Sequence, residues 1–158
     1  MIGKSLNTRH EYRLCLENSE AEVYQPLLLR IEVMSKKLSC VVIDDDGILR
    51  NLMASLMRRL EFNVLGETGH AHDGLKFCMD LHPSLVLLDI NLPEANGIDL
   101  LPQILKLDPA PKVIMVTGEP TLDRVKEALT LGASGLIVKP FTPAKLIAAV
   151  NAALGTQL

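Results

Sequence analysis

The chain has 158 residues, with 16 lysines and arginines against 19 aspartates and glutamates, and a formal net charge of −3. This length fits one domain with a short extension, because typical domains contain roughly 100–200 residues. Hydrophobic residues make up 48% of the chain, which excludes wholesale disorder. Nucleic-acid-binding proteins normally carry an excess of basic residues, and aromatic residues, on which bases stack, account for only 3% here. We therefore expect no nucleic-acid partner.

The cysteines and the apolar runs predict a reducing compartment and no membrane insertion. Cys15, Cys40 and Cys78 are an odd, scattered set, which is typical of neither a disulfide framework nor a zinc site. Charged residues interrupt every apolar stretch near the N-terminus, so we expect no signal peptide. No apolar run reaches the roughly 18 residues that a membrane-spanning helix needs. These features predict a cytoplasmic location.

The first part of the chain differs in character from the rest. Acidic and basic residues are mixed throughout residues 1–37, and the only apolar cluster there, Leu27–Ile31, follows directly after Pro26. We predict a loose or partly helical N-terminal extension over residues 1–37 and a domain over residues 38–158. Met34 is an alternative start of the natural chain, because the residues after it lead directly into the first strong strand.

From Leu38 onward, short apolar runs alternate with amphipathic segments. Runs of Val, Ile and Leu are typical of strands covered on both faces, whereas apolar residues three or four positions apart are typical of helices. Five strand–helix repeats with short connections predict right-handed crossovers and a single doubly wound α/β domain with a parallel sheet. In chain order, the predicted elements are Cys40–Asp44, Ile48–Leu60, Phe62–Gly66, Asp73–Leu81, Ser84–Asp89, Ile98–Leu107, Lys112–Thr117, Thr121–Leu131, Gly135–Lys139 and Pro143–Leu154.

Polar residues stand where four of the predicted strands end. Because the carboxyl ends of parallel strands share one edge of a sheet, where open α/β sheets bind ligands, we expect these residues to converge on one crevice. Crowded carboxylates repel one another and need a cation, and an all-oxygen set favours Mg²⁺. Carboxylates, a hydroxyl and an ammonium group around Mg²⁺ suit phosphoryl transfer, in which a carboxylate can be the nucleophile. The residues are Asp44, Asp45 and Asp46 after the first strand, Asp89 at the end of the third, Thr117 of the fourth and Lys139 of the fifth; the four aspartates are expected to share the Mg²⁺ site.

Four motifs at these strand ends resemble the receiver domain of two-component response regulators, over residues 38–154. The resemblance implies a flavodoxin-like, five-stranded parallel sheet in the order 2-1-3-4-5 with five helices. Since no room remains for an output domain after Leu158, it also implies a stand-alone receiver of the chemotaxis type. The motifs are Val42-Ile43-Asp44-Asp45, residues 87–93 (Leu-Leu-Asp-Ile-Asn-Leu-Pro) with Gly97, Met115-Val116-Thr117-Gly118, and Val138-Lys139-Pro140-Phe141.

The resemblance implies a signalling domain that is phosphorylated, rather than an enzyme with a separate substrate. Asp89 would accept a phosphoryl group from the phosphohistidine of a sensor histidine kinase or a histidine phosphotransfer protein. Thr117 would hydrogen-bond this group, and Lys139 would pair with it after bonding Asp89 beforehand. The face formed by the fourth helix, the fifth strand and the fifth helix would then favour a different downstream protein target. The domain would catalyse only its own phosphorylation and dephosphorylation.

The resemblance also implies Mg²⁺ as the cofactor. Asp45 and Asp89 would bind the ion directly, together with the backbone carbonyl of Asn91, and Asp44 would hold it through water. Asn91 and Glu119 would flank the path of the hydrolytic water, where polar residues favour fast dephosphorylation.

One position departs from the family pattern. Three residues before the lysine the family usually carries an aromatic residue that turns inward on activation, and this chain has Leu136. Leucine can still move, but it presents neither a hydroxyl nor a ring edge to a partner.

Two alternative functions remain open. Residues 41–47 (Val-Val-Ile-Asp-Asp-Asp-Gly) also resemble the opening motif of haloacid-dehalogenase-type phosphohydrolases, with Asp44 as the nucleophile. That family needs a later acidic pair for Mg²⁺, yet no Asp or Glu follows Lys139, and the chain has no room for a cap domain. The second alternative is a receiver-like interaction module that is not phosphorylated. The complete set of acids, threonine and lysine argues against this module, because no binding surface needs that combination.

Overall fold

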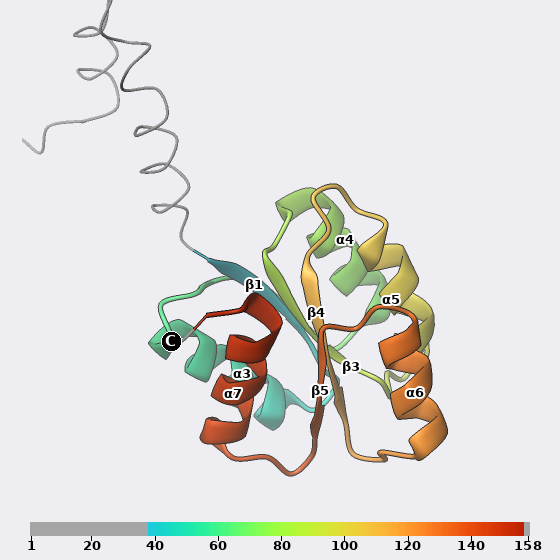
Figure 1. Ribbon diagram of the computed structural model, residues 1–158. Coiled ribbons are helices and arrows are strands. Elements are labelled where there is room, and N and C mark those ends of the chain that lie inside the picture. The colour runs from blue at the N-terminus through green and yellow to red at the C-terminus, as the bar shows by residue number, and fades with distance from the viewer. Residues whose placement is uncertain (1–37, 157–158) are drawn as a thin grey trace, which may run out of the picture. The chain divides into compact units, whose positions relative to one another are not determined.

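The structure of the protein is a computed structural model that describes residues 38–156 (Figure 1). The predictions for residues 1–37, including the partly helical extension and Met34 as a start, lie outside the described residues. Among the described residues, no helix combines the length and the apolar character needed to span a membrane.

The described part of the chain forms five strands that alternate with five helices. The strands form one sheet in the order β2-β1-β3-β4-β5, and every neighbouring pair is parallel. This arrangement confirms the predicted doubly wound, flavodoxin-like fold. The elements are β1 (Ser39–Ile43), α3 (Gly47–Arg59), β2 (Asn63–Thr68), α4 (Ala71–Leu81), β3 (Leu85–Asp89), α5 (Gly97–Leu105), β4 (Lys112–Thr117), α6 (Leu122–Thr130), β5 (Gly135–Val138) and α7 (Pro143–Leu154).

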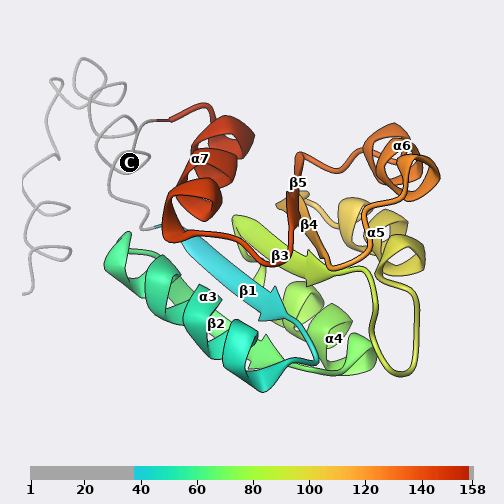
Figure 2. The same cartoon turned by 90° about the horizontal axis from the view of Figure 1, so that it is seen from below.

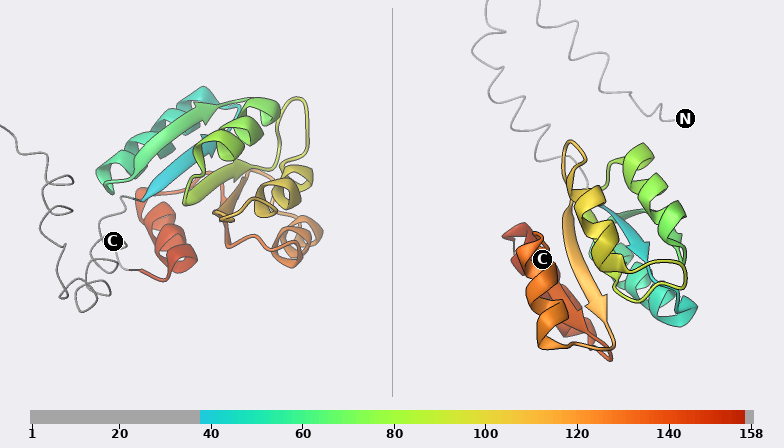
Figure 3. Two further views of the ribbon diagram at one scale, coloured as in Figure 1. Left: turned by 90° about the horizontal axis from the view of Figure 1, so that it is seen from above. Right: turned by 90° about the vertical axis from the view of Figure 1, so that its right-hand side faces the viewer.

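Helices cover both faces of the sheet, with α3 and α7 on one side and α4, α5 and α6 on the other (Figures 2 and 3). Side chains alternate between the faces along each strand, so the core consists of two clusters separated by the sheet. In β3, Leu85 and Leu87 belong to the cluster under α3 and α7, whereas Val86 and Leu88 belong to the other. This double burial explains why the strands are continuous apolar runs.

Polar side chains cap the starts of four of the five described helices, α3, α5, α6 and α7, whereas α4 has no side-chain cap. Thr142, predicted as an N-cap, accepts a hydrogen bond from the backbone N–H of Lys145 at the start of α7. Three boundaries differ from the predicted ones by two residues, and the others differ by at most one. Strand β2 extends to Thr68, whose carbonyl accepts a hydrogen bond from the backbone N–H of Asp44, α4 begins at Ala71, and α5 ends at Leu105. The ends of β1, β3, β4 and β5, where the site residues lie, stay within one residue of the predicted ones.

Candidate functional site

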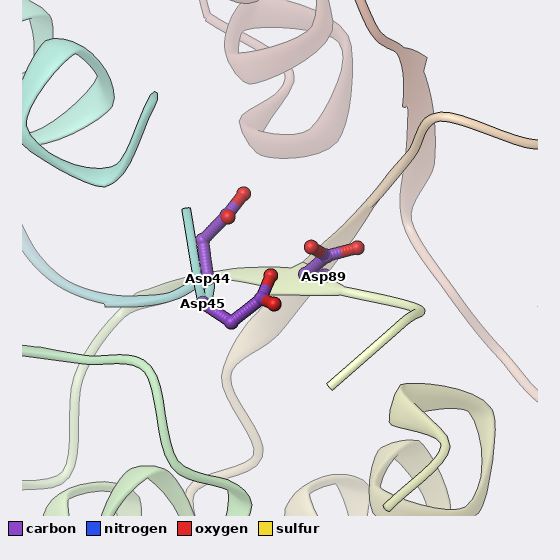
Figure 4. Close-up of side chains that lie close together, drawn as sticks. All are labelled: Asp44, Asp45 and Asp89. Carbon is purple, nitrogen blue, oxygen red and sulfur yellow. The ribbon is translucent and has the colours of Figure 1, made fainter. Parts of the chain in front are cut away.

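Three carboxylates meet at the carboxyl edge of the sheet. Strands β1 and β3 are parallel neighbours with Ile43 opposite Leu88, so the residues that follow them, Asp44 and Asp89, are also neighbours. A carboxylate oxygen of each of Asp44, Asp45 and Asp89 lies within 4.8 Å of the others. Figure 4 shows the three side chains around one space. Asp44 and Asp89 are buried and Asp45 is exposed, so the group has an inner and an outer side.

Lys139 reaches the carboxylates from the end of β5, the outermost strand on the other side of the sheet from β2. Its backbone N–H donates to the carbonyl of Thr117, which anchors it directly after β5. Its ammonium nitrogen Nζ lies 2.8 Å from Asp89 Oδ2, to which it donates a hydrogen bond, and 2.8 Å from Asp44 Oδ2. The lysine side chain is only 15% exposed, so this double ion pair is well shielded from solvent. Lys139 and Asp89 are therefore bonded directly to each other in this structure.

Three side chains of the site each form the same kind of local turn. Asp44, Asp89 and Thr117 each use a side-chain oxygen to accept the backbone N–H two residues later, at 2.9, 3.0 and 3.0 Å. Such turns are favoured by Asp and Thr at strand ends. Thr117 is fully buried and ends β4, which pairs with β3, so its hydroxyl belongs to the same edge as Asp89.

The charges of the site do not balance. Burial raises the pKa of Asp44, the contact with the Lys139 ammonium opposes this rise, and the charge of Asp89 adds to it. Burial by itself lowers the pKa of Lys139, but its contacts with the charged carboxylates of Asp44 and Asp89 outweigh burial, so its pKa is raised overall. The ammonium therefore stays charged at neutral pH. It neutralises one of three carboxylates, and the remaining negative charge favours a cation.

One oxygen of the site lacks a partner of regular geometry. Asp44 Oδ2 is buried and, within residues 38–156, accepts no well-directed hydrogen bond, although Lys139 Nζ lies 2.8 Å away as an ion-pair partner. Buried carboxylate oxygens normally have a hydrogen bond or a cation. Two further carboxylates supply the hard oxygen ligands that Mg²⁺ prefers. The residues present therefore fit a magnesium ion.

Comparison with known proteins places this geometry in a family. The model of the response regulator receiver domain matches residues 40–151. The chain belongs to this family. The chemotaxis protein CheY of Thermotoga maritima is 32% identical to this receiver domain over 111 residues, which cover 70% of this chain and 92% of that protein. Membership of a family of two-component signalling domains favours the receiver interpretation over the phosphohydrolase alternative.

Solved structures show the same fold. The CheY-like receiver domain of Methanospirillum hungatei matches with a TM-score of 0.71 and 29% identity, over 76% of this chain and 95% of that chain. A chain of the CheX–CheY–BeF₃–Mg²⁺ complex of Borrelia burgdorferi matches with a TM-score of 0.70 and 24% identity, over 74% of this chain and 89% of that chain. At the latter identity, the likeness concerns the fold alone.

Asp46 does not take part in the acidic group of this receiver domain, and the expectation of four aspartates around one ion is wrong. Its Oδ1 accepts hydrogen bonds from the backbone N–H groups of Ile48 and Leu49 at 2.9 and 3.1 Å, and so caps α3. An acidic side chain at this position also interacts favourably with the positive end of the helix. Asp46 is therefore structural.

Two arginines that no sequence motif marks also contact the site. Arg50, in the first turns of α3, donates from Nη1 to the carbonyl of Asp44 at 2.6 Å. It lines, together with Asp45, a pocket of about 480 Å³ on the exposed side of the acidic group. Arg124 of α6 donates from Nη1 to Oδ1 of Asn91 at 3.0 Å. Both contacts depend on how a helix is rotated against the sheet, which residue spacing does not reveal.

Replacing Asp44 with Asn is expected to stabilise this receiver domain in the absence of Mg²⁺, by about 1 kcal/mol. The pKa of Asp44 is raised above its ordinary value of 3.8, which means that the fold disfavours the ionised form of this carboxyl group. The neutral amide removes this penalty and keeps an oxygen for the backbone N–H of Asp46. Urea unfolding at pH 7 measures the difference, and Asp46→Asn is the matched control without this gain. A destabilised Asp44→Asn variant would contradict the charge imbalance.

Proposed function

We propose that this receiver domain takes a phosphoryl group onto Asp89 from the phosphohistidine of a sensor histidine kinase or a histidine phosphotransfer protein. The observation that carries this proposal is the position of the Asp89 carboxylate, which contacts the Lys139 ammonium and lies within 4.8 Å of carboxylate oxygens of Asp44 and Asp45. A nucleophilic carboxylate needs opposite charge around it to approach a phosphoryl group that is itself anionic. Lys139 supplies one such charge at 2.8 Å.

Each residue of the site has a separate role in the transfer of the phosphoryl group. An oxygen of Asp89 bonds to phosphorus as the bond from phosphorus to the donor imidazole breaks, and the leaving imidazole takes a proton from solvent. Bound Mg²⁺ would neutralise the oxygens of the transferred group, held by Asp45, Asp89 and the backbone carbonyl of Asn91 directly and by Asp44 through water. Lys139 then pairs with a phosphoryl oxygen.

The phosphoryl group changes the contacts of Thr117. It adds about 1.5–2 negative charges beside a buried hydroxyl. In the present structure Thr117 Oγ1 accepts the backbone N–H of Glu119, and a movement of the hydroxyl toward the phosphoryl group would weaken this bond. That change loosens the loop between β4 and α6. The face formed by α6, β5 and α7 then binds a different downstream protein target.

Leu136 makes the response of this face different from that of a receiver with an aromatic residue there. It lies in β5 and is half-buried against the cluster under α4, α5 and α6. Its side chain can repack, but it offers a partner only an aliphatic surface. We further propose that the domain acts in the cytoplasm and catalyses only its own phosphorylation and dephosphorylation.

The experiment that tests this function is chemical phosphorylation of the purified full chain. We expect incubation with Mg²⁺ and either acetyl phosphate or phosphoramidate, which has the phosphorus–nitrogen bond of phosphohistidine, to add about 80 Da to the intact mass. Borohydride reduction followed by peptide mapping should place the group on Asp89. Asp89→Asn should abolish the adduct, whereas Asp46→Asn, the same change at a neighbouring capping residue, should keep it.

Other outcomes separate the alternatives. An adduct that survives Asp89→Asn and is lost in Asp44→Asn would favour the phosphohydrolase. No adduct with either donor would overturn the proposal and favour an interaction module that is not phosphorylated.

A further inference from the structure

Arg124 connects two loops that leave the site from neighbouring strands. Its Nη1 donates a hydrogen bond to the side-chain oxygen Oδ1 of Asn91, in the loop after β3, at 3.0 Å. The same nitrogen lies 3.5 Å from Oε2 of Glu119, in the loop after β4, as an ion pair. The side chain of Arg124 is 34% exposed and that of Glu119 is 73% exposed, and Asn91 is exposed as well.

Both partners of Arg124 are bonded in turn to the site. The backbone N–H of Asn91 donates to Asp89 Oδ1, and the backbone N–H of Glu119 donates to Thr117 Oγ1, each at 3.0 Å. A continuous chain of polar contacts therefore runs from Asp89 through Asn91, Arg124 and Glu119 to Thr117. Arg124 is the member of this chain that comes from a helix.

Arg124 occupies the two side-chain acceptors nearest in sequence to the reacting groups. Hydrolysis of a phosphorylated Asp89 breaks the bond between the Asp89 oxygen and phosphorus as a water oxygen bonds to phosphorus, regenerating the carboxylate and releasing inorganic phosphate. The attacking water has to lose a proton, and an acceptor that orients it lowers the barrier. Asn91 Oδ1 and Glu119 Oε2 are such acceptors, but both face the guanidinium group.

We propose that Arg124 is a positioning residue that withholds Asn91 and Glu119 from the hydrolytic water and thereby prolongs the life of the phosphorylated state. This inference rests on the proposed function. The contact with Asn91 carries most of the effect, because it is a direct hydrogen bond from a charged donor. The ion pair with Glu119 is longer, at 3.5 Å, and contributes less.

The test measures the rate of phosphate loss from the phosphorylated full chain after the donor is removed, in the presence of Mg²⁺. We expect Arg124→Ala to lose phosphate about threefold to tenfold faster than the unmodified chain, the factor that corresponds to one hydrogen bond. Arg124→Lys should be intermediate. The matched control is Lys126→Ala, which removes the same charge from an exposed position of the same helix and should leave the rate unchanged.

A second background separates positioning from a general loosening of α6. If Arg124 acts through the side chain of Asn91, Arg124→Ala should accelerate hydrolysis much less in a chain that already carries Asn91→Ala. Equal acceleration in both backgrounds, or a rate for Arg124→Ala equal to or below that of Lys126→Ala, would overturn the proposal. If all variants take up the phosphoryl group but hydrolyse alike, Arg124 alone loses its role. If the unmodified chain takes up none, the proposed function fails and this inference fails with it.

Discussion

Replacing Lys139 with Met is expected to lower the free energy of unfolding by about 2–3 kcal/mol at pH 7. The change keeps the length of the side chain but leaves the buried carboxylates of Asp44 and Asp89 without their shared ammonium, which lies 2.8 Å from each. Removal of one partner from a fully buried ion pair costs about 3–5 kcal/mol, and the 15% exposure of Lys139 reduces this penalty. Urea unfolding monitored by circular dichroism measures the loss.

The destabilisation should depend on pH in a defined way. The pKa of Lys139 is raised in the fold, so its stabilising effect is present below the ordinary lysine value of 10.5 and is lost as the pH rises above it. On the acidic side, protonation of Asp44, whose pKa lies above the ordinary 3.8, removes the repulsion in the variant. The difference between the two proteins should therefore be largest near neutral pH and narrow at both extremes.

Two controls sharpen this expectation. Lys145→Met removes a lysine from an exposed position of α7 and should change the stability by no more than about 0.5 kcal/mol. Added Mg²⁺ should recover more stability in Lys139→Met than in the unmodified chain, because the ion replaces the missing positive charge. A loss that fails to narrow at either extreme of pH would mean that packing, not charge, dominates.

Replacing Gly97 with Ala should have the second large effect, a loss of about 2–3 kcal/mol in the free energy of unfolding. Gly97 begins α5 and donates its backbone N–H to the carbonyl of Ile90 at 2.7 Å, which closes the loop after β3. A β-carbon at this position would lie 2.0 Å from the carbonyl oxygen of Asp89. Backbone cannot rotate away as a side chain can, so the loop itself has to move.

The same loop carries Asn91, so the Gly97→Ala variant should also be phosphorylated more slowly by acetyl phosphate. Gly118→Ala is the matched control, because nothing lies within 4 Å of the β-carbon it would introduce. That variant should stay within about 0.5 kcal/mol of the unmodified chain. Equal stabilities for the two alanine variants would show that the loop after β3 can move to accept a β-carbon with no loss in the free energy of unfolding.

The sequence predicted the parts of the site that follow from the ends of strands. Asp44, Asp89, Thr117 and Lys139 each stand at the end of an apolar run, and parallel strands bring such ends to one edge. Their convergence therefore required only the correct reading of strands and their direction. The order of the strands came from the family resemblance, since periodicity does not specify which strands are neighbours.

The remaining parts of the site depend on three-dimensional detail. Asp46 stands in the same acidic run as Asp44 and Asp45, and only the start of α3 at Gly47 shows that it caps the helix instead. Arg124 lies 33 residues from Asn91 in the chain. Its contact depends on the rotation of α6 about its own axis, and a helix that buries only Ala128 gives little sequence signal for that rotation.

The complete burial of β3 has a mechanical consequence. All five of its residues are buried, and β1 and β4 flank it on both edges, so we expect close packing to resist displacement of this strand. A charge added at Asp89 cannot be accommodated by a shift of that strand. We expect the resulting movement to occur at α6 instead, because Ala128 is the one residue of this helix that is buried in the core. If Asp89 is phosphorylated as proposed, we therefore expect the larger displacement at α6 and the smaller one at β3.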